Sequence, residues 1–243
     1  RRFTPGIARE GVPREPMRGK LARVTARSET LVSLRYPVPS RPETLVSLRY
    51  AVRPDYDAWV LHEGNVPESV PHDAAALRLQ LVLSAWAEQS ERDVKIVRNL
   101  AMRWLEEVPQ VGIDPDVAVL EPAPPGADDL RGLRLWVPGH RPPRLCFAIV
   151  SGAHPHKDYV GLQDRYALLG AEELCVFDPL LAGPRSLGGP VSLQLWRRND
   201  DGSFDRSYVG AGAVFSRGLG AWLVPDGRFL AAATDEAGPQ RWP

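Results

Sequence analysis

The sequence is poor in the features that mark membrane proteins, disulfide frameworks and metal ribbons. No apolar run approaches the roughly 18 to 20 residues that a membrane-spanning helix needs, and the first residues lack the apolar core of a signal peptide. We therefore expect a cytoplasmic protein. Only two cysteines occur, Cys146 and Cys175, both in apolar runs and without metal or redox spacing. We expect both to be buried, reduced thiols.

An excess of charge of one sign is also lacking, because thirty basic and thirty acidic residues cancel. This balance argues against binding of nucleic acid through bulk charge alone. The balance hides an asymmetry, since residues 1–53 contain twelve Lys or Arg and four Glu, a net charge of +8, which leaves −8 for the rest. Six prolines interrupt this basic arm. We expect the arm to be extended or disordered and residues 54–243 to form the folded domain.

The basic arm contains the octapeptide ETLVSLRY twice, at residues 29–36 and 43–50. Three interpretations stay open. In the first, the repeat is a recent duplication or translated upstream sequence without a selected role. In the second, it forms a pair of short strands or docking edges, to which its β-branched and aromatic residues are suited. In the third, it is a duplicated peptide tag. TLVSLRY is similar to the short cargo-loading peptides of encapsulin nanocompartments, which share a Thr followed by Ser-Leu-Arg. The last two interpretations imply a protein partner that binds residues 29–50.

From Tyr56 onward the apolar periodicity is typical of a compact α/β domain. Residues 73–89 carry an apolar stripe at helical spacing, with Asp73 suited to the N-cap. Residues 158–169 suit a second helix, with Asp158 at its N-cap and Gly170 at its end. The sequence predicts strands over residues 93–104, 116–120, 145–150, 173–178, 191–196, 207–209, 213–216 and 229–233. This order predicts a mixed β-sheet flanked by helices, with a β-rich C-terminal part.

Several common catalytic motifs are missing. The sequence contains no G-x-S-x-G elbow, no P-loop and no G-x-G-x-x-G that opens a helix. Neither cysteine has a neighbouring histidine motif that would favour a thiol nucleophile. Serine hydrolases, P-loop nucleotide hydrolases and dinucleotide-binding enzymes are therefore disfavoured.

Five segments between about residues 56 and 224 carry a family resemblance. They are GNVPESVPH ending at His72, IDPDVAVL through Asp116, LCFAIVSGAHPHKD over residues 145–158, DRYALLGAEELCVFDP over residues 164–179, and GLGAWL near Trp222. In order and spacing they resemble the Uma-two family of predicted restriction endonucleases, part of the PD-(D/E)XK nuclease superfamily. The resemblance implies a restriction-endonuclease-like fold, DNA as the partner, and an ancestral Mg²⁺- or Mn²⁺-dependent hydrolysis of phosphodiester bonds.

The resemblance also implies where the catalytic residues should lie. Such nucleases hold hard cations with carboxylates on neighbouring strands, and a lysine offsets the charge that develops on the phosphate. The aspartate of the family's PD motif corresponds to Asp116. The family's second carboxylate corresponds to Ala148, and its lysine corresponds to Leu162. Two of three catalytic positions are thus apolar, so we expect a catalytically impaired protein, a pseudoenzyme.

Other residues could substitute for the missing groups. Lys157 and Arg165 bracket the position of the missing lysine, and Asp114 lies two residues before Asp116. On this hypothesis Asp116 and Lys157 would be catalytic, and Asp116 with Asp114 would bind the metal.

Three further polar residues have competing interpretations. His72 could contact a phosphate or the catalytic carboxylate, or could form a hydrogen bond at the helix entry. Asp158 is a supporting residue or simply a helix cap. His154 and His156 lack acidic or cysteine partners at zinc-ligand spacing.

The alternative function is a non-catalytic adaptor that binds DNA or a protein, such as a cargo protein docked through the repeat. The basic arm could supply salt-dependent contacts to phosphates. The sequence is compatible with a homodimer, and nothing in it indicates binding to a membrane. It does not determine a target sequence or a pathway.

Overall fold

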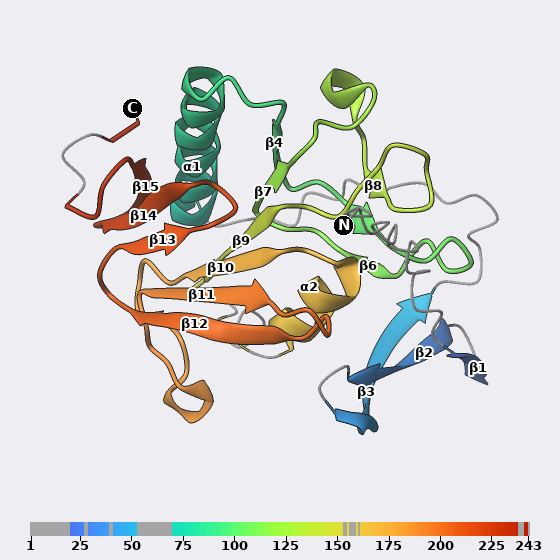
Figure 1. Ribbon diagram of the computed structural model, residues 1–243. Coiled ribbons are helices and arrows are strands. Elements are labelled where there is room, and N and C mark those ends of the chain that lie inside the picture. The colour runs from blue at the N-terminus through green and yellow to red at the C-terminus, as the bar shows by residue number, and fades with distance from the viewer. Residues whose placement is uncertain are drawn as a thin grey trace, which may run out of the picture.

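A six-stranded mixed sheet forms the centre of the computed structural model (Figure 1). The model describes residues 70–152, 155, 159, 161–237 and 241–242, and the backbone of three strands before them. The order across the sheet is β12-β11-β10-β9-β7-β4. Only β9 and β10 pair in parallel; the other neighbours are antiparallel. The strands span Lys95–Arg98 (β4), Val117–Leu120 (β7), Leu145–Ile149 (β9), Glu173–Phe177 (β10), Leu193–Arg198 (β11) and Phe204–Gly210 (β12).

One face of this sheet is covered by helix α1 (Val70–Gln89) and by a three-stranded antiparallel sheet (Figure 1). That small sheet comprises β13 (Val214–Ser216), β14 (Ala221–Asp226) and β15 (Phe229–Ala233). The apolar stripe of α1, which includes Leu79, Leu83 and Trp86, packs with Val117 and Phe147 of the central strands. Burial of such side chains contributes about 1.5 to 3 kcal/mol each, so the apolar stripe determines where α1 binds.

The opposite face carries helix α2 (Leu162–Leu169) and three two-residue strands, β5 (Met102–Arg103), β6 (Gly112–Ile113) and β8 (Leu133–Arg134). Single-turn 3₁₀ helices lie at Ala127–Asp129 and Arg185–Leu187. Because side chains alternate along a strand, the residues between those of the first face point here, among them Ala118, Cys146 and Ala148. The prediction of a mixed sheet flanked by helices is confirmed.

Three sequence predictions about element boundaries were wrong. Residues 93–104 form two strands, β4 and β5, because Asn99 between them adopts a positive φ of 51° that ends regular pairing. Helix α2 begins at Leu162, with Gly161 rather than Asp158 at the N-cap. Helix α1 begins at Val70, which puts Asp73 inside its first turn, where its carboxylate pairs with Arg98.

The two cysteines are buried free thiols, as predicted. Burial raises the pKa of both thiols, so both stay protonated and unreactive. Within the described residues, no helix is long and apolar enough to cross a membrane.

The basic arm contains a three-stranded antiparallel sheet of β1 (Lys20–Ala26), β2 (Glu29–Val38) and β3 (Arg41–Val52). The two copies of ETLVSLRY lie on β2 and β3 and pair with each other. Their register is symmetric, with Val32 opposite Tyr50, Leu34 opposite Leu48 and Tyr36 opposite Val46. The last five residues of each copy, VSLRY, therefore pair with the identical five residues of the other copy about a local two-fold axis.

Two buried acids bracket β10. Glu173, at its start, is 3% exposed and accepts hydrogen bonds from Arg197 Nε (3.0 Å), Ser216 Oγ and the backbone N–H of Gly218 (3.1 Å). Asp178, just after its end, is fully buried and accepts from the N–H groups of Ala182 and Gly183. Such fully paired carboxylates hold the surrounding loops in place.

Candidate functional site

Asp116 lies immediately before β7, at the point where the chain joins the central sheet. Its backbone N–H donates to the Phe147 carbonyl (3.1 Å), and its own carbonyl accepts from Asn99 (3.3 Å). One carboxylate oxygen, Oδ2, accepts a hydrogen bond of 2.5 Å from the N–H of Ile149. The carboxylate is thus held between β7 and β9, and its side chain is 19% exposed.

His72 comes to this carboxylate from the first turn of α1. Its Nε2 lies 3.0 Å from the Ile149 carbonyl oxygen and 3.5 Å from Asp116 Oδ2. The imidazole is 9% exposed. The structure therefore brings together two of the residues selected from the sequence, although they are 44 positions apart in the chain.

Ala148 lies on the strand next to Asp116. In the antiparallel register of β7 and β9, Val117 is opposite Phe147, and Asp116, just before Val117, donates its backbone N–H to the Phe147 carbonyl, next to Ala148 in the chain. Ala148 is 4% exposed and belongs to the same apolar cluster as Leu162, the first residue of α2, which is 7% exposed. The positions expected for the second carboxylate and the lysine are therefore occupied by side chains that pack together on one face of the sheet.

Asp114 is engaged elsewhere. Its carboxylate accepts a hydrogen bond of 2.6 Å from Arg103 Nη1 of β5, and its side chain is 58% exposed. Lys157 and Asp158, like His154 and His156, lie outside the described residues. Arg165 lies within α2.

Magnesium prefers about six oxygen ligands and is usually held by one or two carboxylates and waters. Among the described residues, no group of three or more His, Cys, Asp or Glu side chains is placed to bind a metal ion. One carboxylate beside an imidazole and a methyl group does not provide the required donor set. The described residues therefore do not fit a magnesium site.

A small hollow beside His72 includes residues that the sequence did not indicate. Ser151 and Arg228 line it together with His72, and its volume of about 10 Å³ is close to that of a single water probe. Arg228 comes from the turn between β14 and β15, more than 100 positions from Asp116. No local motif marks such a long-range neighbour.

No protein-family model matches the chain, and no curated protein matches it. Among solved structures, the chain is similar to a protein from Anabaena variabilis ATCC 29413 described as a putative nuclease belonging to DUF820. The two are 11% identical, the match covers 62% of this chain and 74% of the other, and the TM-score is 0.42. A likeness this distant says nothing about what this chain binds or cleaves.

Proposed function

We propose that this chain is a restriction-endonuclease-like protein of the Uma-two type whose ancestral, metal-dependent cleavage of DNA is impaired. The observation that carries the proposal is that the Asp116 carboxylate is held against the strand of Ala148, by the N–H of Ile149. A nuclease of this type needs two acids on these neighbouring strands to share a cation. Here one acid remains, and the position that corresponds to the second acid carries a methyl group.

The neighbourhood of Asp116 supports this interpretation. The carboxylate accepts a backbone hydrogen bond from Ile149 and lies near His72. An aspartate that has lost its metal-binding role could still be kept for such structural contacts. Leu162 packs into the apolar cluster that contains Ala148, and it can neither orient a water nor stabilise charge on a phosphate. Both expected losses therefore fall on one face of the sheet.

A cleavage assay tests the proposal. Purified protein is incubated with plasmid DNA and Mg²⁺ or Mn²⁺, beside the variant Asp116→Ala. We expect the same background nicking for both proteins. A wild-type activity that Asp116→Ala abolishes would show an intact nuclease and overturn the proposed impairment.

Restoration is the sharper experiment. The double variant Ala148→Glu with Leu162→Lys should gain metal-dependent cleavage, and adding Asp116→Ala should remove it again. Because both substitutions put charge into a buried cluster, folding is verified by circular dichroism.

The single variant Ala148→Asp, whose side chain is shorter than that of glutamate, provides a second readout. Mg²⁺ should raise the Tm of Ala148→Asp and leave the Tm of Ala148→Asn unchanged. A folded double variant without cleavage, together with no Mg²⁺ effect on Ala148→Asp, would contradict the assignment.

A second candidate function, a non-catalytic adaptor, is favoured by the self-pairing of the repeat. In the sheet order β1-β2-β3, the second copy of ETLVSLRY lies on an edge strand. An edge strand offers backbone donors and acceptors to an added strand. The proposed partner is an extended protein segment, which would pair with β3.

Peptide competition tests the adaptor. A synthetic ETLVSLRY peptide should bind the full chain saturably, whereas a peptide of the same composition in scrambled order should not. Equal binding of both peptides would remove this candidate.

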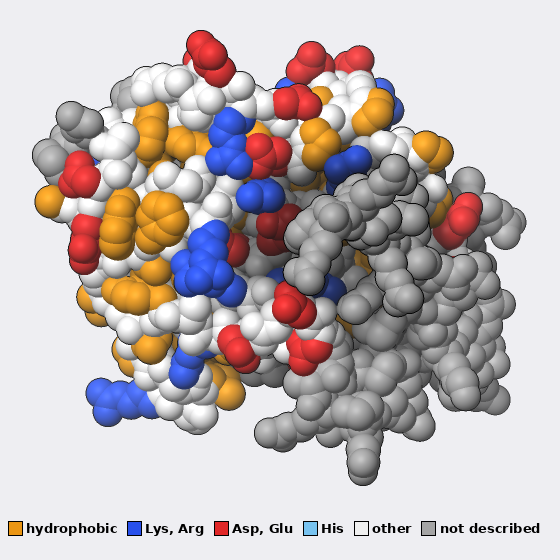
Figure 2. Space-filling model, viewed as in Figure 1, with side chains coloured by type: hydrophobic (Ala, Val, Ile, Leu, Met, Phe, Trp, Pro, Cys, Tyr) orange, Lys and Arg blue, Asp and Glu red, His pale blue; other side chains and the backbone are white. Residues whose placement is uncertain are grey.

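The DNA-binding form of the adaptor rests on the basic arm. Figure 2 shows acidic and basic side chains interspersed over one face of the described residues, without a separate basic region on that face. Filter binding at low salt, with and without residues 1–53, measures the contribution of the arm. No affinity in either protein would exclude DNA as the partner.

A further inference from the structure

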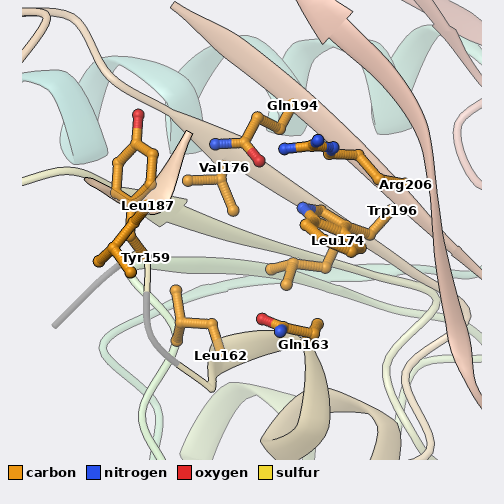
Figure 3. Close-up of a pocket in the computed structure, with 9 residues that line it drawn as sticks. All are labelled: Tyr159, Leu162, Gln163, Leu174, Val176, Leu187, Gln194, Trp196 and Arg206. Carbon is orange, nitrogen blue, oxygen red and sulfur yellow. The ribbon is translucent and has the colours of Figure 1, made fainter. Parts of the chain in front are cut away.

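A cavity of about 150 Å³ lies on the α2 face of the central sheet, away from the Asp116 site (Figure 3). A cavity of roughly this volume accommodates a ring the size of benzene. Its walls come from β10, β11, β12 and α2, and from the loops that carry Tyr159 and Leu187. The cavity is therefore built mainly on regular elements that are fixed by the core.

Register relates the cavity to Ala148. Val176 is paired with Ala148 on one side and with Gln194 on the other. Two strand spacings therefore separate Ala148 from Gln194, about 10 Å at the usual distance between strands. Leu162, the position that corresponds to the family's lysine, also lines the cavity, so the cavity adjoins the apolar cluster that contains Ala148.

The polar groups of the cavity are mostly hydrogen-bond donors. Arg206 is exposed, and its guanidinium carbon lies 5.5 Å from the centroid of the Trp196 ring. Figure 3 shows the indole nitrogen of Trp196 on the side of the cavity, with the amides of Gln163 and Gln194 below and above it. Among the described residues, Arg206 has no carboxylate partner, and neither the Trp196 indole N–H nor the Gln163 amide has a hydrogen-bond partner.

The lining residues that the structure describes include no acid. One of them, Tyr159, donates its hydroxyl to Asp178 (3.1 Å), and that carboxylate also accepts from two backbone N–H groups. Among the described residues, a cation and several neutral donors therefore converge without an acid, which favours a bound oxyanion.

One wall of the cavity is fixed. A Cβ atom added at Gly183 would lie 2.3 Å from Tyr159 Cζ, and one added at Gly189 would lie 2.9 Å from Tyr159 Cε1. The tyrosine ring therefore packs directly against glycine backbone, and its hydroxyl also accepts from the Val191 N–H (3.3 Å). This arrangement keeps the cavity open on the opposite side, where Gln163 and Arg206 lie (Figure 3).

From this geometry we propose that the cavity binds a phosphoryl group, either as free phosphate or at the end of a nucleotide or another phosphomonoester. Arg206 supplies the positive charge, and Trp196 Nε1 and the Gln163 amide donate to the remaining oxygens. Leu162, Leu174 and Val176 contact the carbon that carries the ester. A phosphoryl group with its first carbon matches the volume of the cavity, and the binding does not depend on the proposed nuclease ancestry.

Titration without divalent metal tests the proposal. The probes are inorganic phosphate, 2′-deoxyadenosine 5′-monophosphate and acetate, followed by calorimetry and by the ¹⁵N-indole resonance of Trp196, assigned from the variant Trp196→Phe. We expect saturable binding of at least one of the two phosphates below roughly 10 mM, with a shift of the Trp196 resonance. Binding of both phosphates indicates a general phosphoryl site, and binding of the nucleotide alone indicates a nucleotide site.

Variants at exposed or half-buried positions limit the effect of the test on folding. Arg206→Ala should weaken phosphate binding about tenfold or more, the usual loss when a charged partner is removed. Gln163→Ala should weaken it less, because a neutral donor is lost. Arg131→Ala, at an exposed arginine outside the cavity, is the matched control and should leave the affinity unchanged. No binding of either phosphate, acetate binding as tight as phosphate, or equal losses in Arg206→Ala and Arg131→Ala would each overturn the assignment.

Discussion

Asp116 and Asp178 are two aspartates at strand ends of the same sheet, and their surroundings differ sharply. Asp178 is fully buried and accepts from two backbone N–H groups and the Tyr159 hydroxyl. Asp116 is partly exposed and accepts one backbone hydrogen bond, with an imidazole nearby. A carboxylate whose acceptor positions are filled by loop donors is a structural part of the fold. The proposed function assigns Asp116, which has fewer donors, to a lost metal site, so we expect Asp116 to contribute less to the stability of the fold than Asp178.

The largest expected effect comes from removing Asp178. Asp178→Ala leaves the N–H groups of Ala182 and Gly183 and the Tyr159 hydroxyl without their acceptor. The free energy of unfolding should fall by about 3 to 5 kcal/mol, measured by urea denaturation. Asp178→Asn, which retains one acceptor oxygen, should lose less. A loss below about 1 kcal/mol in Asp178→Ala would remove the structural role that distinguishes Asp178 from Asp116.

A smaller effect is expected at Asp116. Asp116→Ala removes the acceptor for the Ile149 N–H and should cost about 1 to 2 kcal/mol. Asp116→Asn, whose carbonyl oxygen can still accept this hydrogen bond, should cost less than half as much. The same denaturation experiment measures both variants. A loss of unfolding free energy as large as that of Asp178→Ala would show that the two aspartates contribute equally to the stability of the fold.

The smallest effect concerns Tyr159 and alkaline pH. Burial, followed by the neighbouring Asp178 carboxylate, raises the pKa of the Tyr159 phenol. The contribution of the neutral Tyr159 phenol to the free energy of unfolding is therefore fully present below the unfolded-state pKa of about 10. It is lost as the pH rises through the higher folded-state pKa. Tyr159→Phe should cost about 1 kcal/mol at pH 7 and show a shallower loss of stability above pH 10.

Both cysteines remain in the Tyr159→Phe variant, so their own titration contributes equally to the two proteins. The difference between the two pH profiles isolates Tyr159. Identical slopes above pH 10 would mean that burial and the Asp178 carboxylate do not hold the Tyr159 phenol in its neutral form.

The central strands could be predicted from the sequence because burial leaves a strong local signal. The apolar runs at residues 145–150 and 173–178 became β9 and β10, and residues 229–233 became β15 within its exact bounds. Strand β14 was not predicted, since Pro225 and Asp226 interrupt its pattern. The break at Asn99 was missed because a positive φ at a non-glycine residue has only a weak sequence signature.

The two sites differ in what sequence reasoning could find. Asp116, Ala148 and Leu162 were selected through ordered motifs, and the structure holds Asp116 against the strand of Ala148 through the N–H of Ile149. Whether Lys157 or Asp158 supports the site stays a prediction. The cavity was not foreseen, because Gln194, Trp196 and Arg206 belong to an antiparallel pair whose register no local pattern specifies. Convergence of residues across strands is a property of the folded sheet.

The symmetric pairing of β2 with β3 has a consequence for the behaviour of the arm in concentrated solution. Because either copy of the octapeptide offers the same backbone register to the other, a strand from one molecule can replace its counterpart in a neighbour without a change of pairing. Such an exchange would link chains in a domain-swapped assembly. We therefore expect the repeat to promote association of the chains as their concentration rises.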